Sequence, residues 1–331
     1  MITEVKNSWM VIVNPKAGVG KGLTDWPQIS NQLNRNGVEF SCVFTEKKYH
    51  AVELTVKAVK DGYRKIVAIG GDGTINEIVN GIFIQKIVPT TDIYLAVVAV
   101  GTGNDWIRMF GIPKTYPEAV RAIELANTVL QDVGLISFYE TRVKHQRYMA
   151  NVSGLGFDAM VNRRFNKLKE EGRKGKWLYV RSMLRALLSY KIKKFKVTVD
   201  GETLVNGDVF SATVGIGKYN GGGMMQMPNA VFDDGLFDVT VIRKKTKVSV
   251  LYNFKKLYNG KIYRIANISA WQGKRVYVES QPESPIEIDG EAMGYSPFTF
   301  ELIPQSIRVV VGEEFYRSLL KENPHLLDKT A

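Results

Sequence analysis

The sequence predicts two domains: an α/β domain with a mostly parallel sheet, followed by an all-β domain of the sandwich type. Up to about residue 130, short apolar strands alternate with amphipathic helices, as in a parallel sheet covered by helices. After Gln131 the chain offers many short strands separated by turns. The 331 residues, 45% of them hydrophobic, suffice for two cores. We therefore predict one domain over residues 1–130 and a second over 131–312.

The first domain is organised around a glycine-rich stretch that follows a short apolar strand at residues 66–69. Gly70-Gly71-Asp72-Gly73-Thr74 has three glycines in five positions, so the backbone can turn sharply and approach a ligand closely. Thr74 can cap a helix, and Glu77 stands three residues later, the spacing of a capping box. Such a strand–turn–helix unit directs backbone N–H groups at an anion.

A plain tight turn between strand and helix would use the same glycines. Asp72 favours a phosphate site that contains a metal ion, because a carboxylate repels bare phosphate and Mg²⁺ between the two removes the repulsion. A second glycine turn, Gly101 to Asp105, also follows a strand. Two such turns at the carboxyl ends of parallel strands predict a shared ligand crevice.

The other elements of the first domain follow from apolar spacing and from turn residues. The predicted strands and helices lie at residues 9–13, 26–36, 40–44, 51–61, 94–100 and 117–125. Between the first strand and the first helix lies a loop with two lysines, residues 14–21. This loop is either a flexible surface segment or a polyphosphate contact through Lys16 and the backbone amides. It lacks the Gly-Lys-Ser/Thr end of a Walker loop.

In the second domain we predict short strands, listed here by residue number: 133–136, 141–145, 148–153, 195–200, 205–214, 237–242, 275–279, 286–289, 298–302 and 307–311. The stretch 163–196 carries thirteen Lys and Arg against two Glu and contains an amphipathic helix from Trp177 to Tyr190. Its basic side is either a solvated face of a core-packed helix or a surface for anionic lipid headgroups. A short helix is predicted at residues 315–320.

Taken together, the motifs resemble the diacylglycerol kinase catalytic domain family, which includes sphingosine and ceramide kinases. The resemblance rests on residues 70–74 with Asn76-Glu77 and Asn80-Gly81, and on 101–105, 151–159 and 217–239. NAD kinases share the first motif but lack the motif at 101–105 in this form and the block at 217–239. The resemblance implies an ATP- and Mg²⁺-dependent lipid kinase whose last segment, 313–331, returns to pack on the first domain.

The resemblance also implies which residues form the site. The expected nucleotide contacts are Asn14, Pro15, Lys16, Ala17, Gly18, Thr45, Gly70, Gly71, Asp72, Gly73, Thr74, Glu77, Gly101, Thr102, Gly103 and Asn104. Asp72 counts as catalytic as well. A structural Mg²⁺ would bind the Asp234 side chain and the carbonyls of Val231 and Leu236, although a plain Asp-Gly turn is the alternative. The Asp289-Gly290-Glu291 turn would supply the general base; we favour Glu291, with Asp289 as a metal or orienting partner, and the sequence does not separate these roles.

The net charge of +12 favours an anionic partner. No nucleic-acid-binding signature accompanies it, so we expect an anionic phospholipid surface and a lipid substrate there, and no nucleic acid. The charged start has no signal-peptide core, the longest apolar run (95–100) is too short to span a bilayer, and the single Cys42 excludes a disulfide framework. We expect a cytoplasmic protein peripheral to the membrane. Family members often dimerise, so a homodimer is a further expectation.

The predicted function is transfer of the γ-phosphoryl of ATP to the hydroxyl of diacylglycerol or a related lipid. One rival is an NAD-kinase-like enzyme for a soluble substrate, which the motif at 101–105 and the block at 217–239 oppose. A second rival is a non-catalytic lipid-binding protein at the membrane surface. The presence of Asp72, Asp289 and Glu291 opposes it, because a protein without catalysis has no need of these carboxylates.

Overall fold

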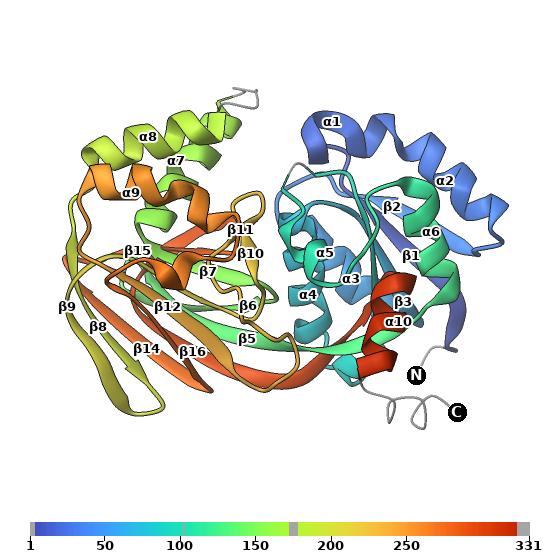
Figure 1. Ribbon diagram of the computed structural model, residues 1–331. Coiled ribbons are helices and arrows are strands. Elements are labelled where there is room, and N and C mark those ends of the chain that lie inside the picture. The colour runs from blue at the N-terminus through green and yellow to red at the C-terminus, as the bar shows by residue number, and fades with distance from the viewer. Residues whose placement is uncertain (1–3, 102, 172–177, 323–331) are drawn as a thin grey trace. The chain divides into compact units, whose positions relative to one another are not determined.

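A computed structural model describes residues 4–101, 103–171 and 178–322 of the chain, which forms two compact units (Figure 1). The nucleotide unit, as we name the first, comprises residues 1–131 and 305–331. The sandwich unit comprises residues 132–304. Two strands contribute residues to both: β5 (Thr128–Glu140) and β16 (Glu291–Val310). The α/β and sandwich-like classes predicted from the sequence are confirmed.

The sheet of the nucleotide unit is parallel and has the order β16-β4-β3-β1-β2. Its strands are β1 (Lys6–Val13), β2 (Phe40–Phe44), β3 (Tyr63–Gly70), β4 (Tyr94–Ala99) and the C-terminal end of β16. The three central strands carry almost continuous buried apolar residues, as expected for strands covered on both faces. All five strands end at one edge, where the glycine turns begin.

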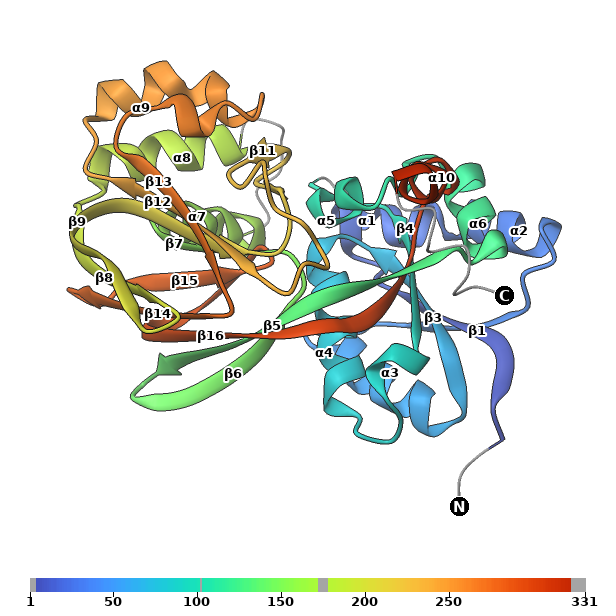
Figure 2. The ribbon, with the colours of Figure 1, turned by 60° about the horizontal axis from the view of Figure 1, so that its bottom comes forward.

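Helices cover both faces of this sheet (Figure 2). Helices α2 (Trp26–Arg35) and α6 (Tyr116–Leu125) pack together on one face, and α3 (His50–Lys60) and α4 (Asp72–Ile84) on the other. Gly81 allows close contact between α3 and α4, since a Cβ there would lie 2.5 Å from the Cβ of Thr55. The remaining helices of this unit are α1 (Ala17–Thr24), η1 (Thr90–Asp92), α5 (Asp105–Met109) and α10 (Glu313–Glu322).

The predicted capping box at the start of α4 is wrong. Gly71 is the N-cap residue, the helix begins at Asp72, and Thr74 lies inside its first turn. The Thr74 hydroxyl instead accepts a hydrogen bond from Asn14 Nδ2 at 2.9 Å. Glu77 caps a different helix: its carboxylate accepts the backbone N–H groups of Tyr49 and Ala51 at the start of α3. The spacing was right for a box, but the helix begins three residues earlier than a Thr74 cap requires.

The sandwich unit is built mainly from antiparallel strands. Its central order is β13-β12-β9-β7-β15, with β8, β14 and the first part of β16 beside them. The strands are β6 (Val143–Met149), β7 (Val152–Gly156), β8 (Lys193–Val199), β9 (Glu202–Gly215), β10 (Tyr219–Asn220), β11 (Met224–Met225), β12 (Phe237–Arg243), β13 (Ile268–Gly273), β14 (Arg275–Gln281) and β15 (Pro285–Ile288). The two strands predicted at 298–302 and 307–311 are one continuous strand, β16.

This unit also contains helices: α7 (Phe157–Glu170), α8 (Leu178–Ser189), α9 (Lys247–Asn253), η2 (Phe254–Leu257) and η3 (Ile262–Arg264). The predicted amphipathic helix corresponds to α8, while its start at Trp177 and the basic residues 173, 174 and 176 lie outside the described residues. The inner faces of α7 and α8 share a core with Phe210 of β9. No helix within the described part of the chain is long and apolar enough to span a membrane.

Helix α10 belongs to the nucleotide unit. The Phe315 ring lies edge-on to Phe110 at 6.3 Å, and a Cβ on Gly111 would lie 2.7 Å from the Phe315 Cβ. The described part of the chain's last segment therefore packs on the turn after α5. The residues beyond Glu322 lie outside the described part.

Candidate active site

The first glycine turn leaves no room for side chains. A Cβ on Gly70 would lie 2.4 Å from Thr74 Oγ1, and a Cβ on Gly71 would lie 3.3 Å from the Cα of Gly101. Gly73 lies in the first turn of α4, directly after Asp72. The turn therefore presents bare backbone at the N-terminus of a thirteen-residue helix, where the free N–H groups and the helix dipole favour an anion.

The second glycine turn lies directly against the first. A Cβ on Gly101 would come within 2.8 Å of the Gly71 Cα, and Asn104 Nδ2 donates to the Gly101 carbonyl at 2.8 Å. Asn104 has a left-handed backbone, with φ of 50°, and its buried Oδ1 has no hydrogen-bond partner among the described residues. Thr102 lies outside the described residues. Neighbouring parallel strands thus bring the two turns together, as their shared position at strand ends predicts.

Asp72, in the first turn, forms hydrogen bonds with the chain at the end of the second turn. Its Oδ1 accepts the backbone N–H of Trp106 at 3.2 Å, and its Oδ2 accepts that of Asp105 at 3.3 Å. Burial raises the pKa of the Asp72 carboxyl, although these backbone N–H groups oppose the shift. A Cβ on Gly103 would lie 3.2 Å from Oδ2, so the chain before α5 passes close over the carboxylate. Asp72 is thus a structural acceptor, whatever further role it has.

The lysine loop approaches the same edge of the sheet. Asn14 bonds Thr74, as described above, and its Oδ1 accepts the Lys16 N–H at 3.0 Å. Gly18 packs on the end of β4, since a Cβ there would lie 1.9 Å from the Val100 carbonyl oxygen. Gly18, Val19 and Gly20 all have positive φ, and left-handed backbone is costly for a β-branched residue such as Val19. This strained loop, with Pro15 and Ala17 in it, is held beside the first glycine turn.

Thr45 and Glu77 lie near the same edge. The buried Thr45 follows β2 and donates its N–H to the Val13 carbonyl at 2.8 Å. Both carboxylate oxygens of Glu77 accept N–H groups of α3, at 3.0 and 3.1 Å. The structure gives Glu77 a clear role in holding α3. The residues predicted to contact a nucleotide, where the structure describes them, therefore lie at the carboxyl edge of this sheet or directly support it.

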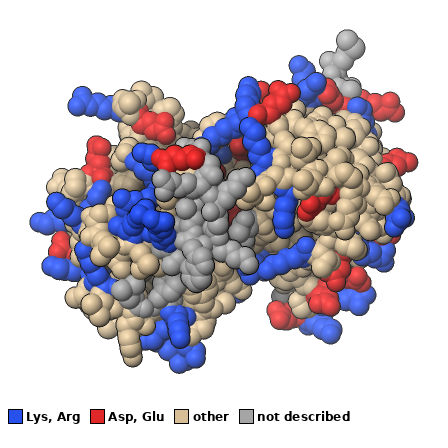
Figure 3. All heavy atoms as spheres, turned by 90° about the horizontal axis from the view of Figure 1, so that it is seen from above, with Lys and Arg blue, Asp and Glu red and all other residues tan. Residues whose placement is uncertain are grey.

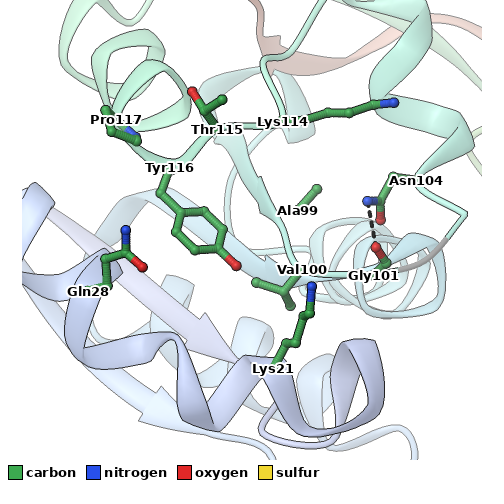
Figure 4. A pocket seen from close by; sticks show the side chains of 10 residues that line it. All are labelled: Lys21, Gln28, Ala99, Val100, Gly101, Asn104, Lys114, Thr115, Tyr116 and Pro117. Atoms are coloured by element: carbon green, nitrogen blue, oxygen red, sulfur yellow. Dashed lines mark hydrogen bonds between the residues drawn. The ribbon is translucent and has the colours of Figure 1, made fainter.

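A pocket of about 400 Å³ opens beside the second glycine turn (Figure 4). Lys21 of α1 extends towards Val100 and Gly101, and Lys114 extends towards Asn104. Tyr116 forms another wall; its hydroxyl donates to Asp25 at 2.5 Å, and this bond lowers the pKa of the Asp25 carboxyl. The lining carries two lysines and no carboxylate, so it suits an anionic group next to the turn. Neither lysine was among the predicted contacts.

In the sandwich unit, the Asp289-Gly290-Glu291 turn joins β15 to β16. Asp289 is buried, has φ of 48°, and its carboxylate accepts three backbone N–H groups, from Ala150, Asn151 and Val152, at 2.8 to 3.0 Å. This many donors fix the carboxylate in place. The side chain of Glu291, at the start of β16, stays partly exposed. Position alone therefore makes Glu291 the more accessible carboxylate.

Sequence reasoning missed two acidic side chains here: Glu287 bonds this turn directly, and Asp158 acts on Glu287 through its charge. Buried Glu287 accepts the Gly290 N–H at 2.9 Å, and Asp158, at the start of α7, accepts Gln226 Nε2 at 2.9 Å. Burial raises the pKa of the Glu287 carboxyl well above its usual range, and the negative charges of Asp158 and Asp289 raise it further. Glu287 alternates with apolar Ile286 and Ile288 in β15, a pattern that predicts an exposed side chain.

The predicted metal turn is acidic. Asp234 Oδ1 accepts the Leu236 N–H at 3.0 Å, and buried Asp132 accepts the Gly235 N–H at 2.7 Å. Burial, together with the negative charges of Asp132 and Asp234, raises the pKa of Asp233. These oxygen donors and their mutual repulsion suit a hard divalent cation. Among the residues described, no three His, Cys, Asp or Glu side chains form a metal-binding group. A cation here would therefore need carbonyls such as those of Val231 and Leu236.

Comparison with known families identifies the family of each part of the chain. A model of the diacylglycerol kinase catalytic domain matches residues 8–136, and a model of the YegS C-terminal NAD kinase beta sandwich-like domain matches residues 151–311. The chain belongs to the diacylglycerol kinase catalytic domain family. This family member is accordingly a kinase, a phosphotransferase of the lipid kinase type, and family membership implies the use of ATP.

Individual relatives of this diacylglycerol kinase family member match over nearly the whole chain. A diacylglycerol kinase of Mycobacterium tuberculosis is 27% identical, covering 90% of this chain and 93% of its own. One from Staphylococcus haemolyticus is 26% identical, covering 96% and 92%. A Bacillus anthracis diacylglycerol kinase structure superimposes with a TM-score of 0.68 at 22% identity, covering 93% and 98%. An Archaeoglobus fulgidus NAD kinase in complex with ATP has a TM-score of 0.50 at 14% identity, covering 95% and 98%, so it shares the fold alone.

Proposed function

We propose that this kinase transfers the γ-phosphoryl of ATP to the hydroxyl of diacylglycerol or of a closely related lipid. The observation that carries the proposal is the contact between the two glycine turns, which Asp72 fastens by two backbone hydrogen bonds. This arrangement gathers bare backbone, a helix N-terminus and lysines around one point, as a polyphosphate requires.

On the donor side, the turn at 70–74 and the loop at 14–18 would hold the phosphates, with Lys16 near the negative charge. Asn104 Oδ1, which no described residue bonds, and the glycine positions that exclude a Cβ fit a ligand that approaches the backbone closely. Mg²⁺, when bound, would neutralise charge on the phosphates. The protein's own contribution is positioning and electrostatic stabilisation, which dominate phosphoryl transfer.

On the acceptor side, the substrate oxygen forms a bond to the γ-phosphorus, the bond to the β,γ-bridging oxygen breaks, and ADP leaves. The hydroxyl proton must go to a base. We assign this base to Glu291, because the three backbone hydrogen bonds to Asp289 stabilise the charged form of that carboxylate and occupy its oxygens. Asp289 then orients the turn that carries Glu291.

An apolar cavity in the sandwich unit supports a lipid as the acceptor. It has a volume of about 70 Å³ and is lined mainly by apolar side chains, including Phe157, Val161, Met183 and Phe210. Asp158 and Gln226 stand at its polar side. Such walls suit hydrocarbon, while the polar side could receive an ester or a hydroxyl group. A soluble dinucleotide would gain little from them.

The decisive experiment is an ADP-release assay with ATP and a panel of acceptors: diacylglycerol, sphingosine, ceramide, phosphatidylglycerol and NAD. We expect turnover with a glycerolipid and none with NAD. Turnover with NAD alone would replace the lipid proposal by the soluble-substrate rival. No turnover with any acceptor, in a protein that still binds vesicles, would favour the non-catalytic rival.

A further inference from the structure

One face of α8 is exposed and unusually apolar for a surface so rich in positive charge. Its inner side chains, among them Met183, Ala186 and Leu187, are buried in the core shared with α7. The outer stripe consists of Arg181, Leu184, Arg185 and Leu188, at helical spacings of three and four. Leu184 is 42% exposed and Leu188 is 74% exposed. Leucines and arginines therefore alternate along one solvent-facing stripe.

Helix α9 extends this surface. It lies beside α8 in both ribbon views, and Lys247 Nζ donates to the Leu188 carbonyl at 2.6 Å, which joins the start of α9 to the end of α8 (Figures 1 and 2). Val248 is 76% exposed and Tyr252 is 83% exposed. We name Leu184, Leu188, Val248 and Tyr252, with the basic residues around them, the α8–α9 surface.

The two segments that carry these apolar side chains have charge of one sign only. The segments 178–190 and 243–258 contain eight Lys and Arg and no Asp or Glu. The exposed basic residues of the surface are Arg181, Arg185, Lys244, Lys247 and Lys255. Only Lys244 has an acidic partner within the described residues, Asp208 at 3.7 Å. Seen from above the view of Figure 1, Lys and Arg side chains lie over the sandwich unit (Figure 3).

We propose that the α8–α9 surface docks on an anionic lipid bilayer, with Leu188, Val248 and Tyr252 entering the headgroup region. The proposal rests on the proposed function for its biological sense, since a lipid kinase must meet its substrate at a membrane. The occupant follows from charge: basic side chains attract an anionic surface, and the apolar side chains between them reach the acyl boundary. A second copy of the chain would bring the same positive surface and be repelled.

The test measures binding of the full-length protein, without ATP, to vesicles of phosphatidylcholine with and without phosphatidylglycerol. Leu188→Ser with Tyr252→Ser removes apolar surface without changing charge, and we expect at least tenfold weaker binding to the anionic vesicles. Arg181→Gln with Arg185→Gln and Lys247→Gln should weaken binding about fivefold per residue at low salt and flatten the salt dependence. Val143→Ser with Ile87→Ser, two exposed apolar residues elsewhere, is the matched control and should bind normally.

Insertion has its own readout. A Tyr252→Trp variant should show a blue-shifted emission difference and quenching by brominated acyl chains when anionic vesicles are added, whereas Ile87→Trp should show neither. Equal binding of all variants, or no quenching at position 252, would overturn the proposal. So would a concentration-dependent dimer in sedimentation that the serine variants dissociate, because a second copy would then cover the surface.

A failure here is distinguishable from a failure of the proposed function. Turnover of a short-chain, soluble diacylglycerol needs no bilayer, so it should be unchanged in the serine variants. If that turnover is absent in the unmodified protein while the vesicle results hold, the kinase proposal fails and the docking proposal stands. If turnover holds and all variants bind vesicles alike, the docking proposal alone fails.

Discussion

The carboxylate of Glu287 accepts the backbone N–H of Gly290 at 2.9 Å, inside the turn that carries Glu291. Helix α7 holds the same turn from another side, because Asn166 Nδ2 donates to the Gly290 carbonyl at 3.1 Å. Together with the three N–H groups on Asp289, these bonds fix the backbone on both sides of Gly290. The direction in which Glu291 leaves this turn is therefore set by buried groups.

The first prediction concerns Glu287. Its pKa is raised well above 4.5 in the fold, so the native state holds a proton that the unfolded chain releases. Stability should thus fall as the pH rises from about 4.5 towards the native pKa. Glu287→Gln resembles the protonated form, so it should remove much of this fall and keep turnover near pH 7. Melting temperatures between pH 5 and 9 test this. A variant with the same pH slope as the wild type would contradict it.

The second prediction concerns Asp72. In Asp72→Asn the remaining oxygen still accepts one of the two backbone N–H groups, from Asp105 and Trp106, while the new NH₂ group faces the other. We expect a loss of about 1–3 kcal/mol in unfolding free energy, from an unsatisfied buried donor, and loss of most turnover. Chemical denaturation and ADP release measure the two effects. Exposed Asp92→Asn is the control. Near-normal turnover at saturating ATP and Mg²⁺ would remove Asp72 from the site.

The third prediction separates the two carboxylates of the second turn. Glu291→Gln should lower kcat by about 10²–10⁴-fold, the usual contribution of a general base, and leave stability and ATP affinity nearly unchanged. Asp289→Asn should lower stability as well as kcat, because its carboxylate accepts three backbone N–H groups. If Glu291→Gln instead weakens ATP binding at unchanged kcat, Glu291 contacts the nucleotide or a metal, and Asp289 becomes the candidate base.

The fourth prediction concerns the acidic turn around Asp234. A cation that binds only the native state stabilises it, by about 2.7 kcal/mol at a hundredfold excess over its dissociation constant. Mg²⁺ should therefore raise the melting temperature of the wild type and have less effect on Asp234→Ala. Asp61→Ala, at a partly exposed position of the nucleotide unit, is a suitable control because it lies in a different compact unit. An equal Mg²⁺ response in all three proteins would exclude this metal site.

The fifth prediction concerns Asp238. Burial raises the pKa of its carboxyl from 3.8 to about 6, with a smaller contribution from Asp234. The native state therefore binds a proton between about pH 4 and 6, and in EDTA stability should fall as the pH rises through this window. Asp238→Asn should flatten that part of the curve. Thermal melts from pH 4 to 7 check the sign, and a rising curve for the wild type would refute it.

Local sequence patterns predicted the elements of the nucleotide unit well. Apolar runs such as 66–69 became buried strands, and the glycine turns after β3 and β4 met because parallel neighbours end at one edge. The capping box failed because Gly71 can adopt an extended N-cap conformation, with φ of −120°, and so moved the helix start ahead of Thr74. Glu77 then found its partners in α3, 26 and 28 residues away, which local spacing cannot show.

The sandwich unit was harder to predict, for a physical reason. Its supporting groups act across long separations: Asp289 bonds residues 137 to 139 positions earlier in the chain. A buried Glu287 also looks like any exposed residue of an alternating strand. The predicted break at 303–306 does not divide the strand: β16 runs on past Pro304, and the irregularity is a left-handed backbone at Gln305, with φ of 43°.

The course of β16 has a consequence for how the protein forms during synthesis. Arg308 and Val309, near the end of the chain, pair with Tyr94 and Leu95 of β4. Until the ribosome has passed residue 309, β4 is therefore an apolar strand with one unpaired edge, a template for wrong pairing with other chains. A nascent chain stalled before residue 305 should consequently need a chaperone on the free edge of β4. The four strands of the parallel sheet other than β16, β1 to β4, are already complete at that point.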